Sequence, residues 1–576
     1  RMTLESLTCM PRPGMLSWRH LAFRAALVLL TTVLLMLDDW IQQRFTSFNQ
    51  ADFELNYFAA LCAFNLGLWL CGSRVFVSCI LALLAGMELV QLSHISYTGR
   101  PLDPIVLAGL FSEFQDVKQV ALAEFADHAY VLFAVLVPYL TAWWLFMKFM
   151  RPDLRRWQRA LGLALVAAGL LSKPYRASYR DLNAFLPGPT RSGLHNSLNT
   201  FSFFLVHDVL RDSKVLRHTA HAAPVSDAAS PMVSPVESDA RHVWLFVADS
   251  LRSEHLGIMG YERATTPRLA RRMEDGLIAR AGVAAAVSTA ATMPLMLNAV
   301  REPGQLGQIR TFSTNLFRFA KEAGFKTYWI SSQESKLLND AGSPYIDVSI
   351  TREDAPQRFR QQGDDALLSL LEEQEWPQKT FVVVLLRSVH APYEANYQHA
   401  REHYARWPDD PSLPREVRGR NAYDNAVLYL DSLLDRMMAK FDKLPGPRHL
   451  VITGDHGQLL GTRGMWGHNV LEPEVADVPV LIWSRDASSS VSEPLARRRW
   501  VSHFDMARWI AGLLGRDIRY PSAVEGVHYV QGKNLYGANT FMEVHEGLTL
   551  EFSDVVSVGH SLPVRPRDPA RSLVAR

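Results

Sequence analysis

The chain has 576 residues, a length at which at least two folded units are expected rather than one compact domain. Its 60 Lys and Arg residues nearly balance its 58 Asp and Glu residues and leave a formal charge of +2. This balance gives no electrostatic reason to expect a nucleic-acid partner, so none is predicted. Hydrophobic residues make up 48% of the chain and are concentrated near its start.

Five apolar stretches in the first third of the chain are long enough to cross a hydrocarbon core of about 30 Å. They are Leu21–Asp38, Leu55–Cys71, Val75–Ser93, Ala129–Met147 and Gln158–Ser172. The fifth has a short uninterrupted apolar core, Leu161–Leu171, which also suits a buried helix of a soluble protein. We predict a transmembrane domain with five helices over residues 1–172, lying in a lipid bilayer.

The Lys and Arg residues of the short loops predict how this domain is oriented. Most of them fall in the segments that would share one side: Arg12, Arg19, Arg74, Lys148, Arg151, Arg155, Arg156 and Arg159. We therefore expect the N-terminus in the cytoplasm and everything after Ser172 outside it. A cleaved signal peptide is the competing interpretation of the first span, but four further spans favour an uncleaved anchor.

Two features of this region have alternative explanations. Glu88 is an ionisable residue within the third span, which suggests either a role in substrate binding or a hydrogen bond to a neighbour such as Asn65. The loop segment Ile105–Phe125 has helix-spaced apolar residues, so it would lie flat in the membrane interface or pack against the soluble domain. All four cysteines precede residue 80, so no disulfide framework is expected in the outer domain.

Residues 173–240 are predicted to be a linker, with a flexible Ala/Pro/Ser-rich tether over His218–Asp239. Residues 241–545 alternate short β-rich apolar runs with helical patterns, which indicates an α/β domain with a largely parallel sheet. The runs are His242–Val247, Lys326–Ile330, Thr380–Leu386, His449–Thr453 and Val480–Trp483. Apolar residues at helical spacing over 422–441 predict a helix packed on this sheet, and residues 546–576 form a C-terminal tail.

Polar side chains follow several of the predicted strands. Asp249 ends the first run, His390 follows the third, and Asp455 and His456 follow the fourth, with His468 shortly after. Each alone has an ordinary explanation, such as a helix cap, a turn with glycine at positive φ, or a histidine bonded to a carbonyl. Because ligands of open α/β sheets bind beyond the carboxyl ends of strands, their common position favours a Zn²⁺ site.

The segment Val287–Leu297 places Ser288 and Thr289 before a helix-like apolar run. Backbone N–H groups at such a helix start would bind an anion, and metal coordination would activate a hydroxyl as a nucleophile. The simpler interpretation is that one of these residues only caps the helix. The segment lacks the Cys-x-Pro-x-Arg pattern of formylglycine sulfatases.

Together these motifs resemble the bacterial inner-membrane phosphoethanolamine transferases of the alkaline phosphatase superfamily, which include enzymes that modify lipid A and cause polymyxin resistance. The resemblance is strongest at 247–255 (VADSLRSEH), 260–267 (GYERATTP), 421–426 (NAYDNA) and 454–461 (GDHGQLLG). It implies a membrane domain of five helices and a periplasmic catalytic domain of sulfatase-like fold.

The resemblance also implies roles for individual residues. Asp249, usually Glu in relatives, Asp455 and His456 would bind zinc, and Thr289 would be both nucleophile and zinc ligand. His390 and His468 resemble histidines that bind phosphate or a second zinc and assist proton transfer, and Lys336 resembles a substrate-contacting lysine. The chain departs from the lipid A enzymes at Ala285 and Leu295, where cysteines are expected.

By this resemblance the protein would transfer phosphoethanolamine from phosphatidylethanolamine, through a phospho-threonine intermediate, to lipid A, the lipopolysaccharide core or a surface glycan. Two alternatives remain open. The same metal and threonine would serve a phosphoglycerol transferase or a phosphodiesterase, and the fold would also serve a non-catalytic lipid-binding regulator.

Overall fold

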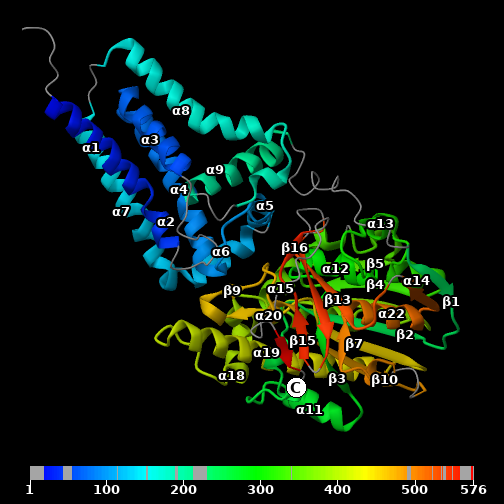
Figure 1. Cartoon of the computed structure of the whole chain (residues 1–576). Coiled ribbons are helices and arrows are strands. Elements are labelled where there is room, and N and C mark those ends of the chain that lie inside the picture. Colours follow the sequence, from blue (N-terminus) through cyan, green and yellow to red (C-terminus); the bar gives the residue numbers. More distant parts are fainter. Residues whose placement is uncertain are drawn as a thin grey trace, which may run out of the picture. The chain divides into compact units, whose positions relative to one another are not determined.

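The computed structural model describes residues 18–42, 55–112, 114–150, 154–187, 192–211, 230–338, 340–488, 494–521, 523–533, 535, 540–547, 549–557 and 572–574. The chain divides into two compact units (Figure 1). The first comprises Arg1–Ser112 and Ala126–Val215, and the second comprises Glu113–Phe125 and Leu216–Arg576. Several predicted features lie wholly or largely outside the described residues: Cys9, Arg12, the side chain of Arg19, Arg151, residues 218–229 of the tether and most of the tail.

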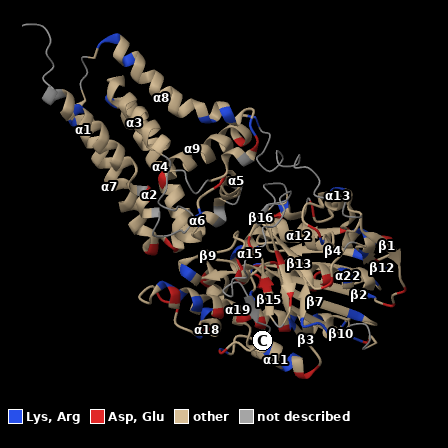
Figure 2. Cartoon of the chain, viewed as in Figure 1, with Lys and Arg blue, Asp and Glu red and all other residues tan. Residues whose placement is uncertain are grey.

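The described part of the first unit consists of helices (Figure 1). They are α1 (Trp18–Leu35), α2 (Leu37–Gln42), α3 (Leu55–Cys71), α4 (Arg74–Thr98), α5 (Pro104–Ser112), α7 (Phe125–Phe149), α8 (Arg156–Ala177), η1 (Leu182–Phe185), α9 (Gly193–Phe204) and η2 (Leu205–Leu210). Three described stretches are long and apolar enough to cross a membrane, namely Leu21–Ile41, Arg74–Thr98 and Phe125–Phe149, and α3 is a shorter apolar helix. Figure 2 shows few charged residues along α1, α3, α4 and α7.

The fifth predicted span lies within α8, which is less apolar than these helices but packs tightly on α3. A Cβ atom on Gly162 of α8 would lie 2.7 Å from the backbone nitrogen of Cys71. A Cβ on Gly67 of α3 would in turn lie 2.9 Å from the carbonyl oxygen of Gly162. Such close approach through small residues is typical of helix pairs in membranes. The two glycines therefore explain why α8 joins this helical unit.

Asn65, the example given of a neighbour that would bond to Glu88, makes its hydrogen bonds elsewhere. The amide nitrogen of Asn65 donates instead to α1, at 2.9 Å to the carbonyl oxygen of Val28 and 2.6 Å to Oγ1 of Thr31. Asn65 therefore ties α3 to α1, while Glu88 is fully buried in α4.

The predicted helix Ile105–Phe125 is divided into α5 and α6 (Phe114–Ala123). Residues Glu113–Phe125 belong to the second unit, where Nε of Arg415 donates to Oε2 of Glu124 at 2.8 Å. For α6, this contact favours packing against the soluble domain over a position flat in the membrane interface.

The second unit contains an eight-stranded mixed sheet. Its strand order is β11 (Trp500–Ser502), β3 (Ile278–Val283), β10 (Asp477–Arg485), β7 (Arg448–Gly454), β2 (His242–Ala248), β6 (Thr380–Leu386), β4 (Lys326–Ser331) and β5 (Val348–Ile350). All five predicted strands are confirmed, and β7, β2, β6, β4 and β5 run parallel. β10 is antiparallel to β7 because the chain after β7 turns back without a long crossover helix, so the sheet is mixed rather than largely parallel.

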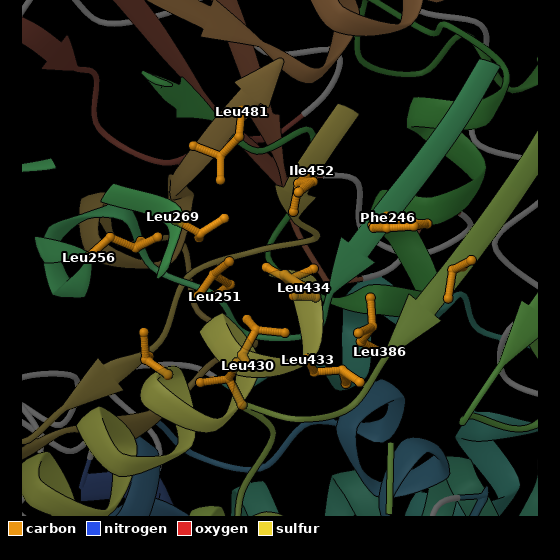
Figure 3. Packing of buried hydrophobic residues seen from close by; sticks show 14 of the residues in the cluster. Phe246, Leu251, Leu256, Leu269, Leu386, Leu430, Leu433, Leu434, Ile452 and Leu481 are labelled. Atoms are coloured by element: carbon orange, nitrogen blue, oxygen red, sulfur yellow. The ribbon is translucent and has the colours of Figure 1, made fainter. Parts of the chain in front are cut away.

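Helices cover both faces of this sheet. One face packs against α11 (Pro267–Glu274), α16 (Asp365–Glu372) and α19 (Arg415–Phe441), and the other against α12 (Thr289–Leu297), α14 (Leu316–Glu322) and α22 (His503–Leu513). Figure 3 shows Leu430, Leu433 and Leu434 of α19 near Ile452 and Phe246 of the sheet. The predicted helix over 422–441 is therefore confirmed, and it fixes the strands whose ends carry the candidate site.

Three smaller sheets complete the described part of this unit. One contains β13 (Val527–Gln531), β14 (Thr540–Glu546), β15 (Thr549–Phe552), β16 (Val556–Ser557) and β17 (Ser572–Val574). The second pairs β8 (Leu459–Leu460) with β9 (Trp466–Gly467), and the third pairs β1 (Met232–Pro235) with β12 (Arg516–Arg519). β1 lies within the segment predicted as a flexible tether, so part of that segment is an ordered strand.

The buried histidine His449 of β7 predicts acid sensitivity. Burial lowers the pKa of His449 from 6.5 to about 4, because charging the ring in the sheet is unfavourable. Its contribution to stability should be complete above pH 6.5 and be lost as the pH falls towards 4, by up to about 3 kcal/mol. Thermal unfolding of the full chain in detergent should show that stability falls less between pH 7 and pH 4 in His449→Gln than in the unchanged protein. The exposed His545→Gln should behave as the unchanged protein.

Candidate active site

Four neighbouring parallel strands end at one edge of the large sheet, and each is followed by a polar side chain. Asp249 follows β2, Asp455 follows β7, His390 follows β6, and Gln333 follows β4. The carboxyl ends of parallel strands are where ligands of α/β sheets bind. The sheet therefore gathers these residues although they are far apart in the sequence.

Asp249, Asp455 and His456 form a buried group that fits a metal ion. Each offers one ligand atom, and these atoms lie within 4.8 Å of one another. Nε2 of His456 lies 3.4 Å from Oδ2 of Asp455 and 3.9 Å from Oδ1 of Asp249. Two carboxylates and an imidazole are a ligand set that Zn²⁺ accepts.

Hydrogen bonds fix the carboxylate of Asp455 but leave one of its oxygens without a donor in the described part of the chain. The backbone N–H groups of Ser250 and His456 donate to Oδ1 of Asp455 at 2.9 and 2.8 Å. Oδ2 of Asp455 is buried and has no hydrogen-bond partner among the described residues. A buried carboxylate oxygen without a donor is costly, and a cation between Asp455 and His456 would satisfy it.

A hydrogen bond also orients the ring of His456, so that its Nε2 faces the two carboxylates. Its Nδ1 lies 2.9 Å from the carbonyl oxygen of Gly457, which assigns the proton to Nδ1 and leaves the lone pair of Nε2 facing the carboxylates. A Cβ on Gly457 would lie 2.2 Å from the carbonyl oxygen of Glu474. Glycine is therefore needed here for close backbone approach, and Gly457 is not among the described glycines with positive φ, contrary to the turn interpretation.

Thr289 faces this group at the first position of α12. The preceding residue, Ser288, is the N-cap, because its side chain accepts from the backbone N–H of Ala291. Oγ1 of Thr289 is therefore not needed as a cap, and it lies 3.5 Å from Nε2 of His456. Thr289 is half-buried, so this residue close to the candidate metal group is not wholly closed off from solvent.

The charges at the site favour a cation. Burial opposes ionisation of Asp249, but the nearby imidazoles of His390, His456 and His468 outweigh it and hold the pKa of Asp249 below its ordinary value. Burial, together with the negative charge of Asp249, raises the pKa of Asp455 to about 6, although His456 opposes this rise. Two close carboxylates of which one resists ionisation are typical of a site whose charge a metal ion balances.

His390 and His468 lie beside this group, whereas Lys336 is an exposed residue three positions after Gln333. The ring centroid of His468 is 4.3 Å from that of His456 and 6.3 Å from that of His390. Both rings are half-buried, and burial together with His456 lowers the pKa of His468 well below its ordinary value. Lys336 lies on η6 (Ser335–Leu338), where its Nζ is 3.1 Å from Oε2 of Glu334. Its contact with substrate stays a prediction.

Sequence reasoning missed the buried support beneath the Asp249 turn. Ser250 adopts a positive φ of 63°, an unusual conformation for a serine. The hydroxyl of Tyr423 in α19 donates to the carbonyl oxygen of Ser250 at 2.7 Å and accepts from the backbone N–H of Arg252 at 2.9 Å. Tyr423 and Asp249 belong to two separate sequence motifs, and these bonds explain why the motifs occur together.

Replacing Tyr423 with phenylalanine should loosen this turn. Two buried backbone groups would lose their partner, so the free energy of unfolding should fall by about 1–3 kcal/mol. The bound zinc measured by elemental analysis should fall as well, because the turn positions Asp249 and Asp455. Tyr404→Phe is the matched control, since the hydroxyl of Tyr404 bonds to Oγ of Ser432 at 3.1 Å. Unchanged zinc content in Tyr423→Phe would contradict this role.

Comparison with known proteins places the second unit among sulfatase-like domains. The sulfatase family profile matches residues 241–516. A Kdo(2)-lipid A phosphoethanolamine 7''-transferase of Salmonella typhimurium is 29% identical over 273 residues, which cover 44% of this chain and 46% of that protein. The phosphoethanolamine transferase EptA of Helicobacter pylori is 24% identical over 272 residues, which cover 44% and 50% of the two chains.

A solved structure resembles most of the chain. The integral membrane protein lipooligosaccharide phosphoethanolamine transferase A of Neisseria meningitidis aligns with a TM-score of 0.56 and 20% identity, covering 86% of this chain and 95% of that one. At this identity the likeness concerns the fold. In sequence, the chain spans about half the length of the two curated relatives named above.

Proposed function

Since the chain belongs to the sulfatase-domain phosphoethanolamine transferase family of the alkaline phosphatase superfamily, we propose that it is a zinc-dependent transferase. The donor is phosphatidylethanolamine, and the acceptor is lipid A, the lipopolysaccharide core or a surface glycan. The single observation that carries this proposal is the hydroxyl of Thr289 beside the buried Asp249, Asp455 and His456, one of whose oxygens lacks a donor among the described residues.

In this proposal Asp249, Asp455, His456 and Thr289 hold the metal. Bound Zn²⁺ would lower the pKa of the threonine hydroxyl and offset negative charge on the phosphoryl oxygens. Oγ1 of Thr289 attacks the phosphorus of the donor, and the bond from phosphorus to the diacylglycerol oxygen breaks. The product is phosphoethanolamine bound covalently to Thr289, together with diacylglycerol.

The neighbouring histidines move the protons in both steps. In the first step, the proton lost by Thr289 passes through His390 or His468 to the departing diacylglycerol oxygen. In the second step, a hydroxyl or phosphate oxygen of the acceptor attacks the same phosphorus, the bond from phosphorus to Thr289 breaks, and the acceptor's proton passes through that histidine back to Thr289. Both rings are half-buried beside the metal group, which is the position that this role requires. Lys336, which is exposed on η6, would contact the substrate.

We further propose that the first unit spans the bacterial inner membrane five times, with α8 as the fifth span, and that the second unit lies in the periplasm. The 22 residues of α8 would extend about 33 Å, which is enough to cross the hydrocarbon core. The tight glycine contact between α8 and α3 supports this arrangement. A lipid donor then diffuses in the same membrane as the enzyme, which raises the rate of encounter.

The choice of donor is tested with labelled lipids. Purified full-length protein with zinc is incubated with phosphatidylethanolamine or phosphatidylglycerol, and the release of diacylglycerol is measured. We expect release from phosphatidylethanolamine. Release from phosphatidylglycerol alone would establish a phosphoglycerol transferase instead, and release from neither lipid would favour a non-catalytic regulator.

A further inference from the structure

Gln333 contacts the metal-binding group from the end of β4. Its Nε2 donates to Oδ2 of Asp249 at 2.6 Å, while Oγ of Ser250 donates to Oδ1 of the same carboxylate at 2.8 Å. Both oxygens of Asp249 are therefore oriented by a side-chain donor. Of these two donors, Gln333 is the one that comes from a different strand.

The backbone of Gln333 is fixed on both sides. Its N–H donates to Oγ of Ser331 at 2.9 Å, and its carbonyl oxygen accepts from the N–H of Arg352 at 3.1 Å. The backbone position of Gln333 is therefore fixed, and the hydrogen bond to Asp249 sets the direction of its side chain.

The lengths of the two side chains match the gap that they bridge. β6 lies between β2 and β4 in the sheet, so the two strand ends are about 9–10 Å apart. Asp249 supplies one methylene group and Gln333 supplies two. An asparagine at position 333 would be one methylene too short to reach Asp249. A glutamate at position 249 would restore the missing length.

We propose that Gln333 is a positioning residue that holds the Asp249 carboxylate in the orientation required to bind the metal. Asp249 follows β2, and the side chain that donates to it comes from the end of β4, another of the parallel strands. This role rests on the proposed zinc site, and it requires no change in the charge of any group. Its measurable consequence is the affinity of the full-length protein for Zn²⁺, before any lipid is added.

Four variants test this role through zinc affinity, measured by titration calorimetry on the full-length protein in detergent. Gln333→Met keeps the length but removes the donor, and Gln333→Asn and Asp249→Glu each change the length by one methylene. Each single variant should bind zinc about 10- to 100-fold more weakly, which is the usual effect of losing such a supporting hydrogen bond. The double variant Asp249→Glu/Gln333→Asn should recover most of the loss, because the summed length is restored.

Gln361→Asn is the matched control, because Gln361 is exposed on α15 (Pro356–Gln362) and should leave zinc affinity unchanged. Equal zinc affinity in Gln333→Met and the unchanged protein would overturn the positioning role while leaving the zinc site intact. A double variant no better than Asp249→Glu alone would also overturn it, since general damage to the fold is not repaired by a second change. Absence of zinc binding in the unchanged protein would overturn the proposed function itself.

Discussion

Replacing Thr289 with alanine is expected to reduce the release of diacylglycerol from phosphatidylethanolamine by at least about a thousandfold. The reason is that the variant has no hydroxyl to attack phosphorus, and removal of a catalytic nucleophile usually costs this much or more. Because Ser288 rather than Thr289 caps α12, the helix should remain and the protein should fold as before. The measurement is the rate of diacylglycerol release at saturating zinc and lipid.

Two further variants separate chemistry from folding in this experiment. Thr289→Ser keeps a hydroxyl at the same position and should retain measurable activity. Thr311→Ala alters an exposed threonine whose Oγ1 bonds to the carbonyl oxygen of Gly307, and it should be fully active. Activity of Thr289→Ala within tenfold of the unchanged protein would exclude Thr289 as the nucleophile.

Replacing His456 with alanine is expected to remove both bound zinc and activity. The imidazole supplies the only nitrogen of the described three-residue group, and the change would leave two buried carboxylates close together without the ring that lies within 4 Å of both. We expect zinc content by elemental analysis to fall to background, and diacylglycerol release to fall at least about a hundredfold.

The control for this change is His403→Ala, because the side chain of His403 is 70% exposed and should not affect zinc. A chelator added to the unchanged protein should reproduce the loss of activity, and added zinc should restore it. Retention of full activity after zinc is removed from the protein would contradict the metal-dependent mechanism.

The strands and the acidic positions of the site follow from the sequence by simple physical rules. A strand buried on both faces is a continuous apolar run, so β2, β6 and β7 are recognisable without a structure. Polar residues that follow such strands lie at one edge of the sheet, which is why Asp249 and Asp455 could be predicted to lie near each other.

Other features depend on partners that are distant in the sequence. Strand direction leaves no trace in an apolar run, so the antiparallel β10 could not be distinguished from a parallel strand. β1 becomes a strand because it pairs with β12, which is more than 270 residues away, and its Ala/Pro/Ser-rich surroundings predict the opposite. The importance of Gln333 lies in its reach to Asp249, which only the strand order reveals, although its position after β4 follows the same rule as the acids.

In the proposed reaction, Thr289 attacks a phospholipid headgroup with the help of a metal held by Asp249, Asp455 and His456. Intact-mass spectrometry of the zinc-loaded protein after brief exposure to phosphatidylethanolamine would detect the covalent intermediate itself. We expect an added mass of one phosphoethanolamine group, located on Thr289 by peptide mapping and absent from Thr289→Ala. An unmodified protein that nevertheless releases diacylglycerol, or a modification on another residue, would contradict it.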